Sequence, residues 1–123
     1  MDTRSKISIG QVAGLARPVA AVTGYFDVLR TDDVRELEQI RSDAAAKSLV
    51  AVVLPKAGEV LPQQARAELA AALRVIDYVV IADDSDPDTL LASLQPDTLV
   101  RLEAAHERRT RQLREHVRSR QTR

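Results

Sequence analysis

The sequence predicts a single α/β domain with a Rossmann-like, doubly wound parallel sheet in three layers, α/β/α. The chain has 123 residues, which is the length of one ordinary domain. Short apolar runs alternate four times with segments of helical periodicity. The runs are continuously apolar, which is typical of parallel strands covered by helices on both faces. Right-handed crossovers between such strands give the doubly wound arrangement.

The first strand–helix–strand unit is predicted over the first half of the chain. Residues 19–23 (V-A-A-V-T) and 49–54 (L-V-A-V-V-L) are apolar runs that indicate buried strands. Between them, residues 32–47 carry apolar side chains at three- and four-residue spacings, as on one buried helix face. These side chains are Val34, Leu37, Ile40 and Ala44.

The second half repeats the pattern. Residues 63–75 predict a helix, and its apolar stripe consists of Ala65, Leu69, Ala72 and Leu73. Strands are predicted at 78–82 (Y-V-V-I-A) and 98–102, with a short helix at 88–94 between them. Four aspartates between positions 83 and 88 precede this helix. They lack the spacing of a calcium loop, so we interpret them as a helix cap and not as a metal site.

Two segments flank this α/β domain, which is predicted over residues 18–102. Residues 1–17 predict an N-terminal arm or short helix, and residues 103–123 an Arg-rich helix packed on the domain or extending from it. Seven arginines and two glutamates give residues 104–123 a charge of +5, and the rest carries −5. Docking by Leu113 and Val117, on this chain or in a homodimer, competes with an anion-binding lid, an RNA or DNA contact, and an acidic partner.

The composition argues against several functions. The chain has no cysteine, so a disulfide framework, a thiol nucleophile and a cysteine zinc site are excluded. A net charge of zero and only three aromatic residues argue against nucleic acid as the partner. No apolar run approaches the ~20 residues that span a bilayer, and there is no signal-peptide pattern. We therefore expect a cytoplasmic protein without a membrane partner.

The loop after the first predicted strand is the expected ligand site. In doubly wound sheets ligands bind beyond the carboxyl ends of the strands. Here the segment Thr23-Gly24-Tyr25-Phe26-Asp27 precedes a helix, whose free N–H groups favour a phosphate. The alternative is a purely structural turn, with the Asp27 carboxylate accepting local N–H groups. Lys56 follows the second strand and is expected at the same edge, as a weaker candidate.

A wider pattern around this loop resembles a known family. The stretch V-T-G-Y-F-D-V-L-R-T-D-D-V-R-E-L-E-Q-I, residues 22–40, is similar to the opening signature of cytidylyltransferase-like nucleotidyltransferases. That signature has a Gly-x-Phe-Asp turn, a leucine, a His-x-Gly-His tetrad and a helix. Arg66, before the third strand, and P-D-T-L-V-R, residues 96–101, also look like family motifs. The resemblance covers roughly residues 6–102 and is greatest to the nucleotidyltransferase domain that makes ADP-heptose, then to glycerol-3-phosphate cytidylyltransferases.

The resemblance implies attack of a sugar or alcohol phosphate on the α-phosphate of CTP or ATP, with release of pyrophosphate. It implies that residues 23–27, Arg66 and Arg101 contact the nucleotide, and that the tetrad histidines supply positive charge. In this chain the tetrad reads Arg30-Thr31-Asp32-Asp33. Arg30 can donate to a phosphate, whereas a carboxylate at position 33 opposes it. No metal ligand or cofactor is evident, and Mg²⁺ is expected if the domain is active.

Three functions therefore remain open. We predict a diverged domain, impaired in catalysis, that retains nucleotide binding or serves as a scaffold. The second hypothesis is an active transferase in which Arg30 binds phosphate and Asp33 bridges Mg²⁺. The third is an interaction domain that works through the Arg-rich helix.

Simpler structural roles compete with these site assignments. Arg30 and Asp33 can form a local ion pair, and Thr31 or Asp32 can cap the helix. His106 and His116 are ten residues apart on one predicted helix, so we interpret both as surface residues.

Overall fold

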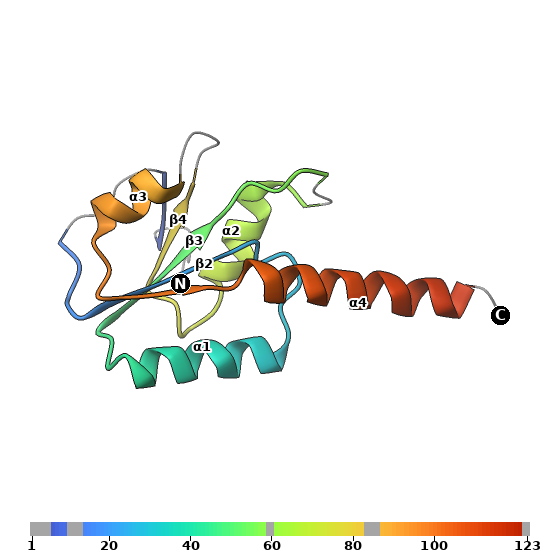
Figure 1. Ribbon diagram of the computed structural model, residues 1–123, viewed down its shortest axis with the longest axis horizontal. Helices are drawn as coiled ribbons and strands as arrows, with labels where there is room; N and C mark the ends of the chain where they lie inside the picture. Colours follow the sequence, from blue (N-terminus) through green and yellow to red (C-terminus); the bar gives the residue numbers. More distant parts are fainter. Residues whose placement is uncertain (1–5, 10–13, 59–60, 83–86, 122–123) are drawn as a thin grey trace.

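A five-stranded parallel sheet organises the computed structural model, which describes residues 6–9, 14–58, 61–82 and 87–121 (Figure 1). The strands are β1 (Ile7–Ile9), β2 (Val19–Gly24), β3 (Ser48–Val53), β4 (Tyr78–Ile81) and β5 (Thr98–Arg101). Their order across the sheet is β1-β4-β3-β2-β5, and every pairing is parallel. The predicted Rossmann-like fold is confirmed.

Helices cover both faces of the sheet. They are α1 (Thr31–Asp43), α2 (Gln63–Ala71), α3 (Pro87–Leu94) and α4 (Glu103–Gln121). Leu37 of α1 and three alanines of α2 (Ala67, Ala70 and Ala71) pack in one core cluster, whereas Leu91 and Leu94 of α3 pack in the other. Figure 1 shows α3 and α1 on opposite sides of the strands. The sheet is thus the middle of three layers.

Burial explains why the strands could be predicted from the sequence. Every residue of β2 and β3 is buried, because each of these strands has a neighbour on both sides and a helix layer on both faces. β5 lies at the edge and alternates half-buried with exposed side chains. Leu99 is accordingly exposed despite its apolar side chain.

Two elements differ from the sequence prediction. Ile7–Ile9 add a parallel edge strand to β4, where the sequence predicts an arm or short helix. α2 ends at Ala71, and its buried face consists of Arg66, Ala67, Ala70 and Ala71. The predicted stripe is wrong for Leu69 and Ala72, which are exposed, because small alanines form the face that meets the sheet. Leu73 of the stripe packs partly buried against the core. Positions 83–86 of the acidic cluster lie outside the described residues.

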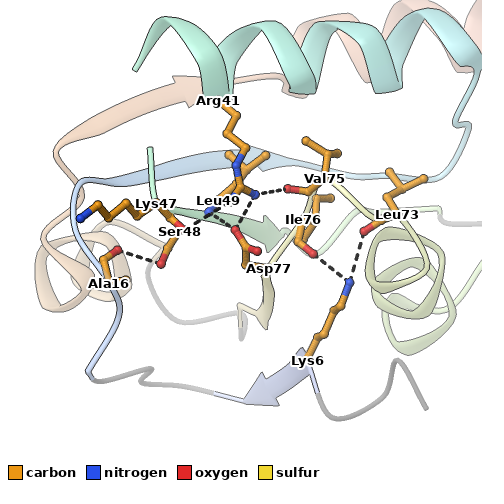
Figure 2. A network of polar contacts seen from close by, with 10 residues as sticks. All are labelled: Lys6, Ala16, Arg41, Lys47, Ser48, Leu49, Leu73, Val75, Ile76 and Asp77. Carbon is orange, nitrogen blue, oxygen red and sulfur yellow. Dashed lines mark hydrogen bonds and ion pairs between the residues drawn. The ribbon is translucent and has the colours of Figure 1, made fainter. Parts of the chain in front are cut away.

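The edge of the sheet at the amino ends of its strands is closed by a polar network (Figure 2). Asp77 Oδ2 accepts the backbone N–H of Leu49 at 2.8 Å and an N–H of the Arg41 guanidinium at 2.6 Å. Arg41 also donates to the carbonyl of Val75, and Lys6 Nζ to that of Ile76. These contacts join α1, β3 and the loop before β4, and they leave the opposite edge to the candidate site.

Helix α4 begins on the sheet and extends away from it (Figure 1). Its start is buried at His106, whereas Leu113 and Val117 are 49% and 45% exposed. The prediction that these two residues dock the helix on this chain is therefore wrong, because about half of each residue is exposed, whereas their docking in a homodimer stays a prediction. In the part of the chain that the structure describes, no helix has the length and apolarity needed to cross a membrane.

Candidate functional site

The candidate site lies where β2 and β5 end side by side. β2 pairs with β3 on one side and with β5 on the other, so the order of strands reverses at β2. Crevices for ligands form at such reversal points, beyond the carboxyl ends of the strands. The turn at residues 24–27, hereafter the 24–27 turn, follows β2, and α4 starts directly after β5. The two segments meet at this edge.

His106 of α4 fills the 24–27 turn. Its Nδ1 accepts the backbone N–H groups of Tyr25 at 2.9 Å and of Phe26 at 3.1 Å. Its ring also meets the Phe26 ring edge-on, with centroids 4.8 Å apart. The prediction of a surface histidine is thus wrong for His106, which is 3% exposed, whereas His116 is exposed as predicted.

The protonation state of His106 follows from this geometry. Nδ1 can accept two N–H groups only when it carries no proton, so the ring is neutral with its hydrogen on Nε2. Burial lowers the pKa of His106 below its usual value, against the carboxylates of Asp33, Asp27 and Glu103, which raise it.

The imidazole of His106 lies so close to residue 24 that only glycine fits there. A Cβ at this position would lie 2.4 Å from Nδ1 and Cε1 of His106. Phe26 has a left-handed φ of 54°, and its side chain is fully buried in the core. Thr23 is also buried and donates its hydroxyl to Glu103 of α4. The side chains of Thr23 and Phe26 are therefore packed inside the protein and leave only backbone groups to face a ligand.

Asp27 forms an ion pair with Lys56 at the site. Its Oδ2 accepts hydrogen bonds from Lys56 Nζ at 2.7 Å and from the hydroxyl of Thr110 at 3.1 Å, while its buried Oδ1 has no hydrogen-bond partner among the described residues. Lys56 also lies 5.0 Å from the centre of the Tyr25 ring. Burial raises the pKa of Asp27, but the hydrogen bond and charge of Lys56 outweigh it and hold the pKa below its usual value.

The degenerate tetrad has a structural role in the start of α1. Asp33 is buried, and its Oδ2 accepts the backbone N–H of Arg30 at 2.8 Å. Its Oδ1 lies 3.4 Å from Nε of Arg109, so the ion pair of Asp33 joins α1 to α4. The predicted capping by Thr31 or Asp32 and the predicted local ion pair with Arg30 are replaced by these contacts. The Arg30 side chain is exposed.

Arg66 and Arg101 do not converge. Arg66 is fully buried and donates to the carbonyls of Tyr25, Leu54 and Leu61, at 3.0, 2.8 and 3.2 Å. Arg101 is exposed on the other face of the sheet, where it lies 3.5 Å from Asp88 of α3. Only Arg66 reaches the 24–27 turn.

Two adjoining cavities lie between the segment after β2 and α4, and both are bordered by Val28 and Leu113. One, of about 240 Å³, is lined by charged groups that include Asp27, Lys56, Arg66 and Arg114. The other, of about 510 Å³, is lined by Arg30, Arg109, Gln112 and His116. Among the charged side chains of the two linings cations predominate, so the arrangement can receive an anionic ligand. No group of three metal-ligating side chains occurs among the described residues.

The role of α4 in the site was missed from the sequence. His106, Arg109, Thr110 and Leu113 follow Leu102 at helical spacings and face the same side, which is the signal that could have identified them. Most of these side chains are polar, whereas a buried helix face is normally recognised by the periodicity of its apolar residues. This face of α4 therefore could not be recognised by that criterion.

The chain is similar to curated bacterial proteins. It is 33% identical over 96 residues to the bifunctional protein HldE of Syntrophotalea carbinolica, covering 69% of this chain and 19% of that protein. It is 35% identical over 109 residues to HldE of Hyphomonas neptunium, covering 76% and 21%. The chain thus spans about a fifth of the length of these relatives. No family model matches it.

A solved structure has a similar fold. The lipopolysaccharide core biosynthesis protein from Thermoplasma volcanium superposes with a TM-score of 0.59 and 22% identity. The match covers 66% of this chain and 70% of that one.

Proposed function

This chain is a cytidylyltransferase-like nucleotidyltransferase domain, homologous to about a fifth of the bifunctional HldE proteins, and on that premise we propose that it binds the phosphates of a nucleotide without transferring them. The proposal has two parts, loss of the transfer step and retention of an anion site. The identity of the nucleotide, CTP or ATP, is left to the experiment.

One observation carries the first part. Asp33 stands where the resemblance places the second tetrad histidine, and both of its oxygens are engaged, with the backbone of Arg30 and with Arg109. It therefore stabilises the fold and carries a negative charge near the place of a transferring phosphate. Unit charges of the same sign at ~4 Å repel by about 4 kcal/mol at intermediate dielectric. The same engagement makes Asp33 a poor Mg²⁺ ligand, which argues against a bridging metal at this residue.

The cations around the two cavities support the second part. Arg30 and Arg109 line the larger cavity, and Lys56 and Arg114 line the smaller one. Guanidinium groups bind phosphate oxygens in pairs of parallel hydrogen bonds. Of the two arginines in the larger cavity, Arg30 is the more favourable for a ligand, because its side chain is exposed and Arg109 is paired with Asp33.

A panel of thermal unfolding measurements tests both parts. CTP, ATP, CMP and ADP are added with and without Mg²⁺, to the native chain, to Arg30→Ala and to Arg74→Ala. Arg74 is an exposed arginine in the loop after α2, outside both cavities, and serves as the matched control. A ligand at a hundred times its Kd stabilises by about 2.7 kcal/mol, or several degrees for a domain of this size.

We expect one triphosphate to raise the melting temperature of the native chain and of Arg74→Ala, but not of Arg30→Ala. We expect no pyrophosphate when the bound triphosphate is incubated with sugar or alcohol phosphates. Release of pyrophosphate would replace the proposal with an active transferase. A flat panel at millimolar ligand would refute nucleotide binding.

The exposed part of α4 favours a second candidate, an interaction domain that forms a homodimer. Leu113 and Val117 lie one helical turn apart and are flanked by Arg114 and Arg118 around an open groove. The mass of the native chain in solution, compared with that of the Leu113→Ser and Val117→Ser double variant, tests this candidate. A monomeric native chain would exclude it.

A further inference from the structure

We propose that His106 is an internal latch on the 24–27 turn: its Nδ1 holds the position that a phosphate oxygen would take, and a phosphate binds there only when the imidazole leaves. The inference rests on the proposed function, because it assigns a regulation to that same site. Four features of the structure support it.

The first feature is the convergence of two donors on one atom. The N–H groups of Tyr25 and Phe26 point at Nδ1 of His106, at 2.9 and 3.1 Å. Successive backbone N–H groups that turn toward one point, with a left-handed residue among them, form a concavity that binds anions. Phe26, with its φ of 54°, supplies that conformation. The turn therefore has the geometry of an anion site, and its occupant is a neutral nitrogen.

The second feature is steric. The imidazole atoms Nδ1 and Cε1 occupy the space above Gly24 so closely that one added Cβ would lie 2.4 Å from them. A phosphate oxygen on the same two amides needs that space. The imidazole and the ligand are thus mutually exclusive on the turn.

The third feature is the way α4 is held. Besides His106, the contacts between the helix and the segment at 23–33 come from Glu103, Arg109 and Thr110. The distal part of the helix extends away from the sheet (Figure 1). His106 alone provides two hydrogen bonds to the turn, so its release removes a large share of the polar contacts that keep α4 in place.

The fourth feature is the charge around His106. Carboxylates face it from the 24–27 turn (Asp27), from α1 (Asp33) and from α4 itself (Glu103), and Lys56 faces it from the loop after β3. A proton on Nδ1 would remove the acceptor of the Tyr25 and Phe26 N–H groups. These two amides and the charged ring could then donate hydrogen bonds to an anion. Acidic pH therefore favours the open latch, and neutral pH the closed one.

Calorimetry with inorganic pyrophosphate as the probe tests the latch. The variant His106→Ala removes the imidazole and frees both amides. The matched control His106→Asn keeps an acceptor oxygen where Nδ1 lies and carries no charge at any pH. Two net hydrogen bonds lost from the closed state correspond to an affinity gain of about tenfold to a hundredfold. We expect this gain for His106→Ala at pH 7.5 and native affinity for His106→Asn.

A second measurement does not depend on the folding of His106→Ala. In nitrogen-15 spectra of the native chain, saturating pyrophosphate should shift the amides of Tyr25 and Phe26 and the Nδ1 resonance of His106 together. The variant Gly24→Ala should bind no pyrophosphate at the turn, because its Cβ would lie 2.4 Å from the position that Nδ1 holds and that a phosphate oxygen would take. These two readouts decide the matter if His106→Ala does not fold.

Two outcomes overturn the latch and are distinguishable from each other. If pyrophosphate binds the native chain, His106→Ala and His106→Asn with equal affinity and leaves the Nδ1 resonance of the native chain unchanged, the latch is refuted and the proposed anion binding stands. If it binds none of them, both the latch and the proposed function are refuted.

Discussion

Removing the buried guanidinium of Arg66 should destabilise the domain by about 3 kcal/mol. Its side chain, 0% exposed, donates to the carbonyl oxygens of Tyr25, Leu54 and Leu61 and so joins the ends of β2 and β3 to the loop before α2. Hydrogen bonds from a charged donor each contribute about 1.5–3 kcal/mol. Arg66→Ala leaves buried carbonyls without this donor and creates a cavity. Relief of the buried charge offsets part of the loss.

Urea unfolding followed by circular dichroism measures this effect. Arg66→Lys should recover part of the loss, because one ammonium cannot reach all three carbonyls. Arg74→Ala, an exposed arginine, should stay within about 0.5 kcal/mol of the native chain. A loss below about 1 kcal/mol for Arg66→Ala would refute the reasoning and return Arg66 to the set of phosphate-binding candidates.

Three further predictions follow from the structure. Burial lowers the pKa of His106, so the unfolded chain binds a proton first and the free energy of unfolding should fall as pH drops below about 6.5. His106→Asn should remove this slope in urea titrations between pH 7.5 and 5. Asp77→Ala, which loses the bonds to Leu49 and Arg41, should lower stability by about 2 kcal/mol, and Asp77→Asn by less; equal losses would contradict the role of its acceptor oxygen. The Leu113→Ser and Val117→Ser double variant should melt within a few degrees of the native chain, because both side chains are exposed.

The sheet could be predicted because its central strands are apolar without interruption. The runs at 19–23 and 49–54 match β2 and β3 to within one residue, since both faces of these strands are covered. β1 could not be found in the same way. It has three residues, and a serine separates its two isoleucines, so neither a buried run nor a long alternation is present.

The edge of the sheet that holds the site could be predicted, whereas the side-chain contacts at the site could not. The position of Gly24 after β2 follows from strand topology. The contact that requires this glycine comes from His106, far along the chain, and no local pattern encodes it. Arg66 was identified from a family motif, but its burial depends on carbonyls from loops whose course the sequence does not reveal.

Because β2 pairs with β5, the sheet cannot form completely until the residues of β5 are present. β2 lies inside the sheet, yet one of its partners is β5, which pairs Ala20 with Thr98 from the far end of the fold. Until that late segment arrives, one side of β2 presents unpaired N–H and C=O groups, a template for pairing with other chains. Pairings between distant segments also slow folding, because a long loop must close first. A chain interrupted before residue 98 is therefore expected to aggregate through β2.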